Sequence, residues 1–84
     1  MPHVKLFALS TCIHCRNTKS FLDDNKVAYD CVFVDTLQGD ERKNTIDEIK
    51  RFNQACSFPT MVIDGGQRVI IGFRADDIRE ALGI

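Results

Sequence analysis

The sequence predicts an α/β protein in which helices flank a mixed four-stranded sheet, with the element order βαβαββα. Two observations lead to this prediction. The first half of the chain reads as strand, helix and strand, which implies a right-handed crossover and parallel pairing. Near the end, Asp64-Gly65-Gly66 separates two short apolar runs and is typical of an antiparallel hairpin turn.

The first three elements follow from local composition. Residues 4–9 (VKLFAL) are a short apolar run between polar residues and predict a buried strand. A helix is expected over residues 12–26, with Ser10 or Thr11 as its N-terminal cap. Residues 27–35 (VAYDCVFVD) are rich in β-branched and aromatic side chains and predict the second strand.

The remaining elements are a second helix, a hairpin and a last helix. The charged segment at residues 41–55 carries apolar side chains at helical spacing and predicts an amphipathic helix. The two hairpin strands and the loop after them are short, and we place them at residues 61–63, 68–71 and 72–75. Asp76 is expected to cap a last helix that runs to Leu82.

Length and charge restrict the class of protein. The chain has 84 residues and a net charge of −1, and we interpret residues 1–84 as a single domain with no nucleic-acid partner. No apolar run approaches the roughly 20 residues that span a bilayer. The N-terminus also lacks the features of a signal peptide. We therefore expect a monomeric protein of the reducing cytoplasm that does not associate with membranes.

The cysteines carry the chemistry that this sequence predicts. Cys12 and Cys15 stand in a CxxC motif where a predicted strand gives way to a helix. The positive end of a helix stabilises a thiolate, and in CxxC motifs the thiol pKa falls from about 8.5 to roughly 3.5–7.5. Cys12, at the very start, is the expected attacking thiolate, and Cys15, one turn further in, is the expected resolving thiol.

The cysteines and His14 also allow other interpretations. A structural zinc site needs about four ligands, and the chain has one CxxC motif, so we expect no resident metal. Cys31 reads as a core side chain, and Cys56 as either a buried apolar side chain or a third redox thiol. His14 either tunes the pKa of Cys12 or is an exposed spacer.

Three motifs resemble the glutaredoxin family of the thioredoxin superfamily. They are Cys12-Ile13-His14-Cys15 after the first strand, Ser57-Phe58-Pro59-Thr60 before the third, and Gly72-Phe73-Arg74 before the last helix. The resemblance implies a thioredoxin-like fold, disulfide oxidoreductase activity, and a cis peptide bond before Pro59 beside the dithiol. Such a turn leaves the backbone of Phe58 free to pair with an extended substrate.

The sequence departs from common glutaredoxins in places that bear on the electron donor. Ile13 and His14 replace proline and tyrosine, and residues 9–11 lack the lysine that often binds a glutathione carboxylate. Residues 72–77 resemble the NrdH-type redoxins, which accept electrons from a thioredoxin reductase. The resemblance therefore implies either glutathione or a thioredoxin-reductase-like enzyme as the reductant.

These observations define a main hypothesis and two alternatives. The main one is a dithiol oxidoreductase that reduces protein or small-molecule disulfides without a tightly bound cofactor. The residues expected to contact the substrate are Ile13, His14, Phe58, Pro59, Phe73 and Asp76. The first alternative is an iron–sulfur cluster or metal carrier that uses the same cysteines, and the second is a binding module with incidental cysteines.

Overall fold

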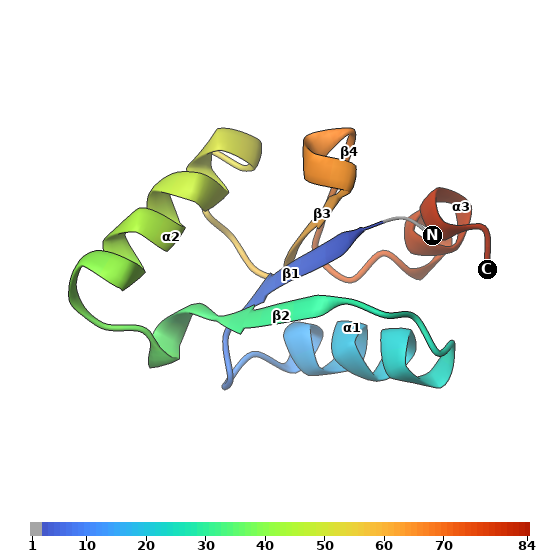
Figure 1. The fold of residues 1–84 in the computed structure, drawn as a ribbon. Helices are drawn as coiled ribbons and strands as arrows, with labels where there is room; N and C mark the ends of the chain where they lie inside the picture. Colours follow the sequence, from blue (N-terminus) through green and yellow to red (C-terminus); the bar gives the residue numbers. More distant parts are fainter. Residues whose placement is uncertain (1–2) are drawn as a thin grey trace.

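The computed structural model describes residues 3–84 and confirms the predicted βαβαββα order (Figure 1). The strands are β1 (Val4–Ala8), β2 (Asp30–Phe33), β3 (Thr60–Ile63) and β4 (Arg68–Ile71). The helices are α1 (Ile13–Asp24), α2 (Gly39–Phe52) and α3 (Ala75–Leu82), with short 3₁₀ turns at Val34–Thr36 and Asp64–Gly66. The strand order is β2-β1-β3-β4, with β1 and β2 parallel and the other two pairs antiparallel.

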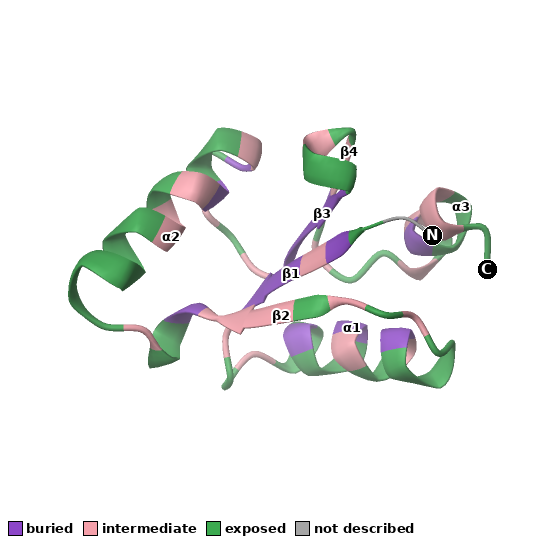
Figure 2. Cartoon of the chain, in the orientation of Figure 1, coloured by how far each residue is buried: buried purple, intermediate pink, exposed green. Residues whose placement is uncertain are grey.

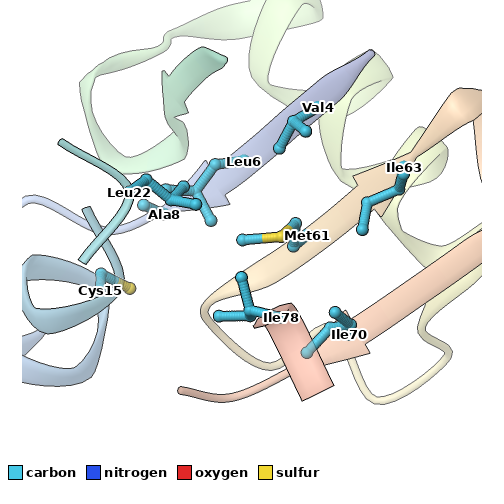
Figure 3. Close-up of a cluster of buried hydrophobic side chains, with 9 residues drawn as sticks. All are labelled: Val4, Leu6, Ala8, Cys15, Leu22, Met61, Ile63, Ile70 and Ile78. Atoms are coloured by element: carbon cyan, nitrogen blue, oxygen red, sulfur yellow. The ribbon is translucent and has the colours of Figure 1, made fainter. Parts of the chain in front are cut away.

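The core lies on both faces of the sheet because successive side chains of a strand point to opposite sides. On one face, alternate residues of β1 and β3 pack with side chains of α1 and α3 (Figure 3). This first cluster consists of Val4, Leu6, Ala8, Cys15, Leu22, Met61, Ile63, Ile70 and Ile78. Cys15 is thus a member of the hydrophobic core as well as of the CxxC motif.

The second face is covered by α2 and holds a smaller cluster. Phe7, Val34, Ile49 and Val62 form this second cluster. Ile49 of α2 is buried in the core, whereas most of the charged residues of this helix are exposed, as the helical spacing predicts. Figure 2 shows that most of α2 is exposed. The sheet therefore separates α1 and α3 on one side from α2 on the other.

The start of α1 differs from the prediction. The N-terminal cap is Cys12, rather than Ser10 or Thr11, and its carbonyl oxygen accepts the first helical hydrogen bond from Arg16 at 3.1 Å. Ser10 is engaged elsewhere, because its backbone N–H and its hydroxyl both bond to Asp35. The sulfur that was predicted to react also performs the capping.

Two other elements differ from their predicted bounds, one strand being shorter and one helix lying slightly earlier in the chain. Strand β2 covers only residues 30–33 of the predicted 27–35, because β1 offers it partners only from Lys5 to Ala8. Helix α2 runs from Gly39 to Phe52 instead of over residues 41–55.

The predicted cap of α3 was wrong. Its N-terminal cap is Arg74, whose carbonyl oxygen accepts the N–H of Ile78 at 3.0 Å, so the helix begins before Asp76. Asp76 and Asp77 instead lie in its first turn, where Asp77 pairs with Arg74 at 2.9 Å.

Candidate dithiol site

The CxxC motif begins where β1 ends, and a tight turn joins the two. The N–H of Cys12 donates to the carbonyl of Leu9 at 3.2 Å, and the N–H of Leu9 lies 3.5 Å from the Cys15 sulfur. The N–H of Cys15 donates to the Cys12 sulfur at 3.4 Å. Both sulfurs are therefore bonded into one short stretch of backbone at the amino end of α1.

The two thiols have contrasting surroundings. Cys12 is partly exposed, whereas Cys15 is 2% exposed and packs in the first cluster. A hydrogen bond from the Cys15 side chain lowers the pKa of Cys12 below 9.0, and the backbone N–H groups of Cys15 and His14 act in the same direction. Burial raises the pKa of Cys15 to about 12. At neutral pH the accessible thiol is thus the more acidic one, and the buried thiol keeps its proton.

The proline loop lies beside this turn. The Phe58–Pro59 peptide bond is cis, as the resemblance implied. Thr60, the residue after Pro59, pairs with Phe7 near the end of β1, so the proline precedes β3 at the end of the sheet where the chain leaves β1 for Cys12. Phe58 is half-buried and packs against the same cluster as Cys12.

A buried amide that the sequence analysis missed organises the proline loop. Asn53 is 5% exposed, and its side-chain amide donates to the Ser57 carbonyl at 3.2 Å and to the Thr60 hydroxyl at 3.1 Å. Thr60 in turn donates to the carbonyl of Ser57 at 2.7 Å. The only local signal is an asparagine just after a helix, which is common at helix ends, so sequence reasoning had no reason to assign it a role.

A second missed pair anchors the loop that precedes Cys12. The backbone N–H of Ser10 donates to one carboxylate oxygen of Asp35 at 3.0 Å, and the Ser10 hydroxyl donates to the other. The pairing of Ala8 with Phe33 could have indicated this contact, since it places the residues after both strands side by side. That register was not known from the sequence.

The structure brings some of the predicted site residues together and places others apart. Ile13 is 60% exposed and His14 is exposed, and both follow Cys12 in the first turn of α1. Phe73 instead packs edge-to-face on Phe21, well along α1, with ring centroids 5.9 Å apart. Phe73 and Asp76 line a shallow hollow at the start of α3. The contacts of these four residues with a substrate stay predictions.

The other two cysteines are also free thiols. Cys31 is half-buried and packs against the first cluster, and Cys56 is half-buried against the second. Within residues 3–84, no three His, Cys, Asp or Glu side chains come together as metal ligands would. In the same range, none of the helices combines the length and apolar character that a membrane span requires.

The fold and the site together define a class. A CxxC pair at a helix amino end, beside a cis-proline loop on a mixed four-stranded sheet, is the arrangement of a thioredoxin-like redox protein. The profile of the glutaredoxin family matches residues 4–68, and the chain belongs to this family. The thioredoxin-like fold and the family resemblance are thereby confirmed.

Solved structures agree with this assignment. The glutaredoxin of Methanosarcina mazei Go1 is 43% identical with a TM-score of 0.90, over 98% of this chain and 79% of that one. Methanoredoxin of Methanosarcina acetivorans is 41% identical with a TM-score of 0.93, over 98% of this chain and 85% of that one. The NrdH-redoxin of Escherichia coli shares the fold at 19% identity and a TM-score of 0.68, covering 93% and 92% of the two chains. A search of curated protein sequences gave no significant match.

Proposed function

We propose that this protein reduces disulfide bonds in proteins or small molecules, with Cys12 as the nucleophile and Cys15 as the resolving thiol. One observation carries the proposal: the Cys12 sulfur accepts the backbone N–H of Cys15 at 3.4 Å, and the pKa values of the two neighbouring thiols are shifted in opposite directions. An attacking thiol must be accessible and more readily ionised than an ordinary thiol, and Cys12 is partly exposed with a lowered pKa. A resolving thiol must lie close to the nucleophile and stay protonated until the mixed disulfide has formed. The position and the raised pKa of Cys15 meet both requirements.

The reaction takes place in two exchanges. The Cys12 thiolate attacks one sulfur of the substrate disulfide, so that a Cys12–substrate disulfide forms and the other substrate sulfur leaves as a thiolate, which takes a proton from water. Cys15 then gives its proton to water and attacks the Cys12 sulfur. This second exchange forms the Cys12–Cys15 disulfide and releases the second substrate thiolate, which is likewise protonated. Two electrons pass from the protein dithiol to the substrate.

The first exchange also prepares the second. The hydrogen bond and the negative charge of Cys12 both contribute to the high pKa of Cys15, after the larger effect of burial. Once Cys12 is part of a mixed disulfide it no longer carries that charge. The pKa of Cys15 then falls, so the resolving thiol becomes more acidic only after substrate has been captured.

The surroundings of Cys12 support a substrate that is partly apolar. Ile13 is largely exposed next to the nucleophile, and Phe58 is half-exposed before the cis bond. Under this proposal the backbone of Phe58 pairs with the segment that carries the disulfide, beside Pro59. His14 contacts the leaving sulfur, while Phe73 and Asp76 contact more distant parts of the substrate.

The oxidised protein must be reduced again. Members of the family typically work with glutathione or with thioredoxin-reductase-like enzymes, and we propose one of these as the donor. Residues 1–84 act in this scheme as one glutaredoxin-like domain, a cytoplasmic monomer without a resident cofactor. Turnover with glutathione plus glutathione reductase, compared with turnover with thioredoxin reductase, identifies the donor.

The test of the proposed function is trapping. With a fluorogenic peptide disulfide as substrate, Cys12→Ser abolishes reduction, and Cys15→Ser accumulates a Cys12–peptide disulfide visible by mass spectrometry. Cys31→Ser is the matched control and retains activity. An unreduced peptide with no trapped adduct would contradict the proposal. Brown protein from anaerobic purification, absorbing in the region of about 400 nm, would favour the cluster carrier instead.

A further inference from the structure

We propose that Asp35 is a positioning residue for the nucleophile: its carboxylate holds Ser10 by two hydrogen bonds and thereby fixes the turn that presents the Cys12 sulfur. This inference rests on the proposed function, because it concerns the thiol that attacks the substrate. Asp35 lies outside the CxxC motif and outside the proline loop, and the inference assigns it an effect on the reactivity of Cys12.

The first support is the way in which the sheet brings the two residues together. Ala8, at the end of β1, pairs in parallel with Phe33, at the end of β2. The chain leaves both strands at the same end of the sheet, as Figure 1 shows. Ser10 and Asp35 each follow by two residues, although they lie 25 positions apart in the sequence.

The second support is the geometry of the contact. Both oxygens of Asp35 are used, one by the Ser10 backbone N–H at 3.0 Å and one by the Ser10 hydroxyl. Two bonds to one carboxylate fix an orientation as well as a distance, and hydrogen bonds to an ionised group are stronger than neutral ones. The pKa of Asp35 is lowered, first of all by the bond from the Ser10 hydroxyl, so the carboxylate stays ionised at neutral pH.

The third support is the rigidity of the segment that carries Asp35. Val34 is 2% exposed and belongs to the second cluster, so the backbone next to Asp35 is anchored in the core. The N–H of Leu37 closes a 3₁₀ turn on the carbonyl of Val34 at 3.2 Å, and the Thr36 hydroxyl donates to the carbonyl of Phe33 at 2.7 Å. The backbone that carries the Asp35 carboxylate is therefore held in place.

The consequence for Cys12 follows from the turn between them. Leu9 and Cys12 close this turn with a 3.2 Å hydrogen bond, and Ser10 lies inside it. The Cys12 sulfur accepts the N–H of Cys15 only while Cys12 keeps its extended capping conformation. If Ser10 is released, the turn opens for part of the time, and the thiolate loses the donor that stabilises it.

The test measures the reactivity of Cys12 directly, in the full chain, by site-resolved alkylation with iodoacetamide across pH. We expect Asp35→Ala to slow alkylation of Cys12 by about 3- to 10-fold at pH values below the pKa of this thiol, as a rise of roughly half a unit to one unit in that pKa would. Asp35→Asn keeps an acceptor for the N–H and offers a donor to the hydroxyl, so its rate stays within about 2-fold of wild type. Ser10→Ala, which keeps only the backbone bond, falls between the two.

Asp30→Ala is the matched control. Asp30 is an exposed carboxylate at the start of β2, the strand that Asp35 follows, and it bonds to His3 at 3.2 Å. Its loss should leave the alkylation of Cys12 unchanged, while the thermal midpoint of every variant reports its folding.

Three outcomes would overturn the inference. Asp35→Ala could react like wild type, or Asp35→Asn could be impaired as strongly as Asp35→Ala. Both variants could also react faster than wild type, which would mean that the charge of Asp35 acts on Cys12 by repulsion. An unreactive Cys12 in the wild-type protein would instead contradict the proposed function, so the two failures are distinguishable.

Discussion

The amino ends of α1 and α3 have similar surroundings in the fold, but their first turns carry different chemical groups. Each follows a loop that leaves the sheet, and each has the partial positive charge of a helix amino end. At α3, Asp76 and Asp77 lie in the first turn and match this charge. At α1, the first turn has no acidic side chain, and the sulfur of Cys12 is the group that accepts an N–H.

The difference shows how a reactive thiolate is obtained from ordinary elements. Among the three α-helices in residues 3–84, α1 alone has no acidic side chain in its first turn. Carboxylates there would stabilise the helix, but they would also repel a neighbouring thiolate. The composition of that turn thus favours the ionised form of Cys12 over the stability of the helix.

Making α1 resemble α3 should have the largest effect. His14→Glu places a carboxylate in the first turn, two residues after Cys12. The added negative charge should raise the pKa of Cys12 and slow its alkylation below that pKa by up to about 10-fold, the effect of one pKa unit. Rates measured between pH 5 and 8, with each cysteine resolved by mass spectrometry, test this prediction.

The neutral variant His14→Gln is the control for the loss of the imidazole. It should react within about 2-fold of wild type, because it adds no charge. If the glutamate and glutamine variants react equally, the field at the start of α1 does not govern the thiolate.

Replacing the Cys12 sulfur, which caps α1, should change the free energy of unfolding separately from the disulfide-reducing activity. Serine is a strongly preferred capping residue, so Cys12→Ser should increase the free energy of unfolding relative to Cys12→Ala by about 1 kcal/mol. Neither variant should reduce disulfides. Urea unfolding of the reduced proteins measures the difference, and equal stabilities would mean that residue 12 does not cap the helix through its side chain.

Removing charge from α3 should have the smallest effect. Asp76→Asn and Asp77→Asn should each lower the free energy of unfolding by about 0.3–1 kcal/mol, because they remove a favourable charge from the first turn. Asp77→Asn also loses the ion pair with Arg74. The reactivity of Cys12 should not change in either variant, and urea unfolding combined with the alkylation rates checks both statements. A changed rate would show that the two helix ends are coupled.

The sequence was sufficient for those features that depend on neighbours in the chain. Composition, apolar spacing and turn residues predicted the four strands and three α-helices of residues 3–84. The position of the CxxC motif between a strand and a helix predicted which thiol is more exposed. The cis bond before Pro59 followed from the resemblance. These features reflect local patterns, or a motif carried by a few adjacent residues.

Features that depend on how the loops fold against the rest of the chain were missed. Ser10 is a good cap in isolation, but it is bonded to Asp35 across the end of the sheet, so the cap is Cys12. Asn53 gains its role only when the proline loop folds back over it. The Ser10–Asp35 contact requires the register of β1 and β2, and the Asn53 contacts require the fold of the loop between residues 53 and 60; no local pattern specifies either.

The central claim is that the two thiols of one motif have opposite acidities, and a site-resolved titration of the reduced protein tests it most directly. Initial alkylation rates of Cys12 and Cys15 are measured from pH 4 to 11 on the same sample. The rate at Cys12 should rise through a midpoint below 9.0, while Cys15 should remain unreactive until far above it, in keeping with a pKa of about 12. Coinciding profiles with a midpoint near that of an ordinary thiol would contradict the account.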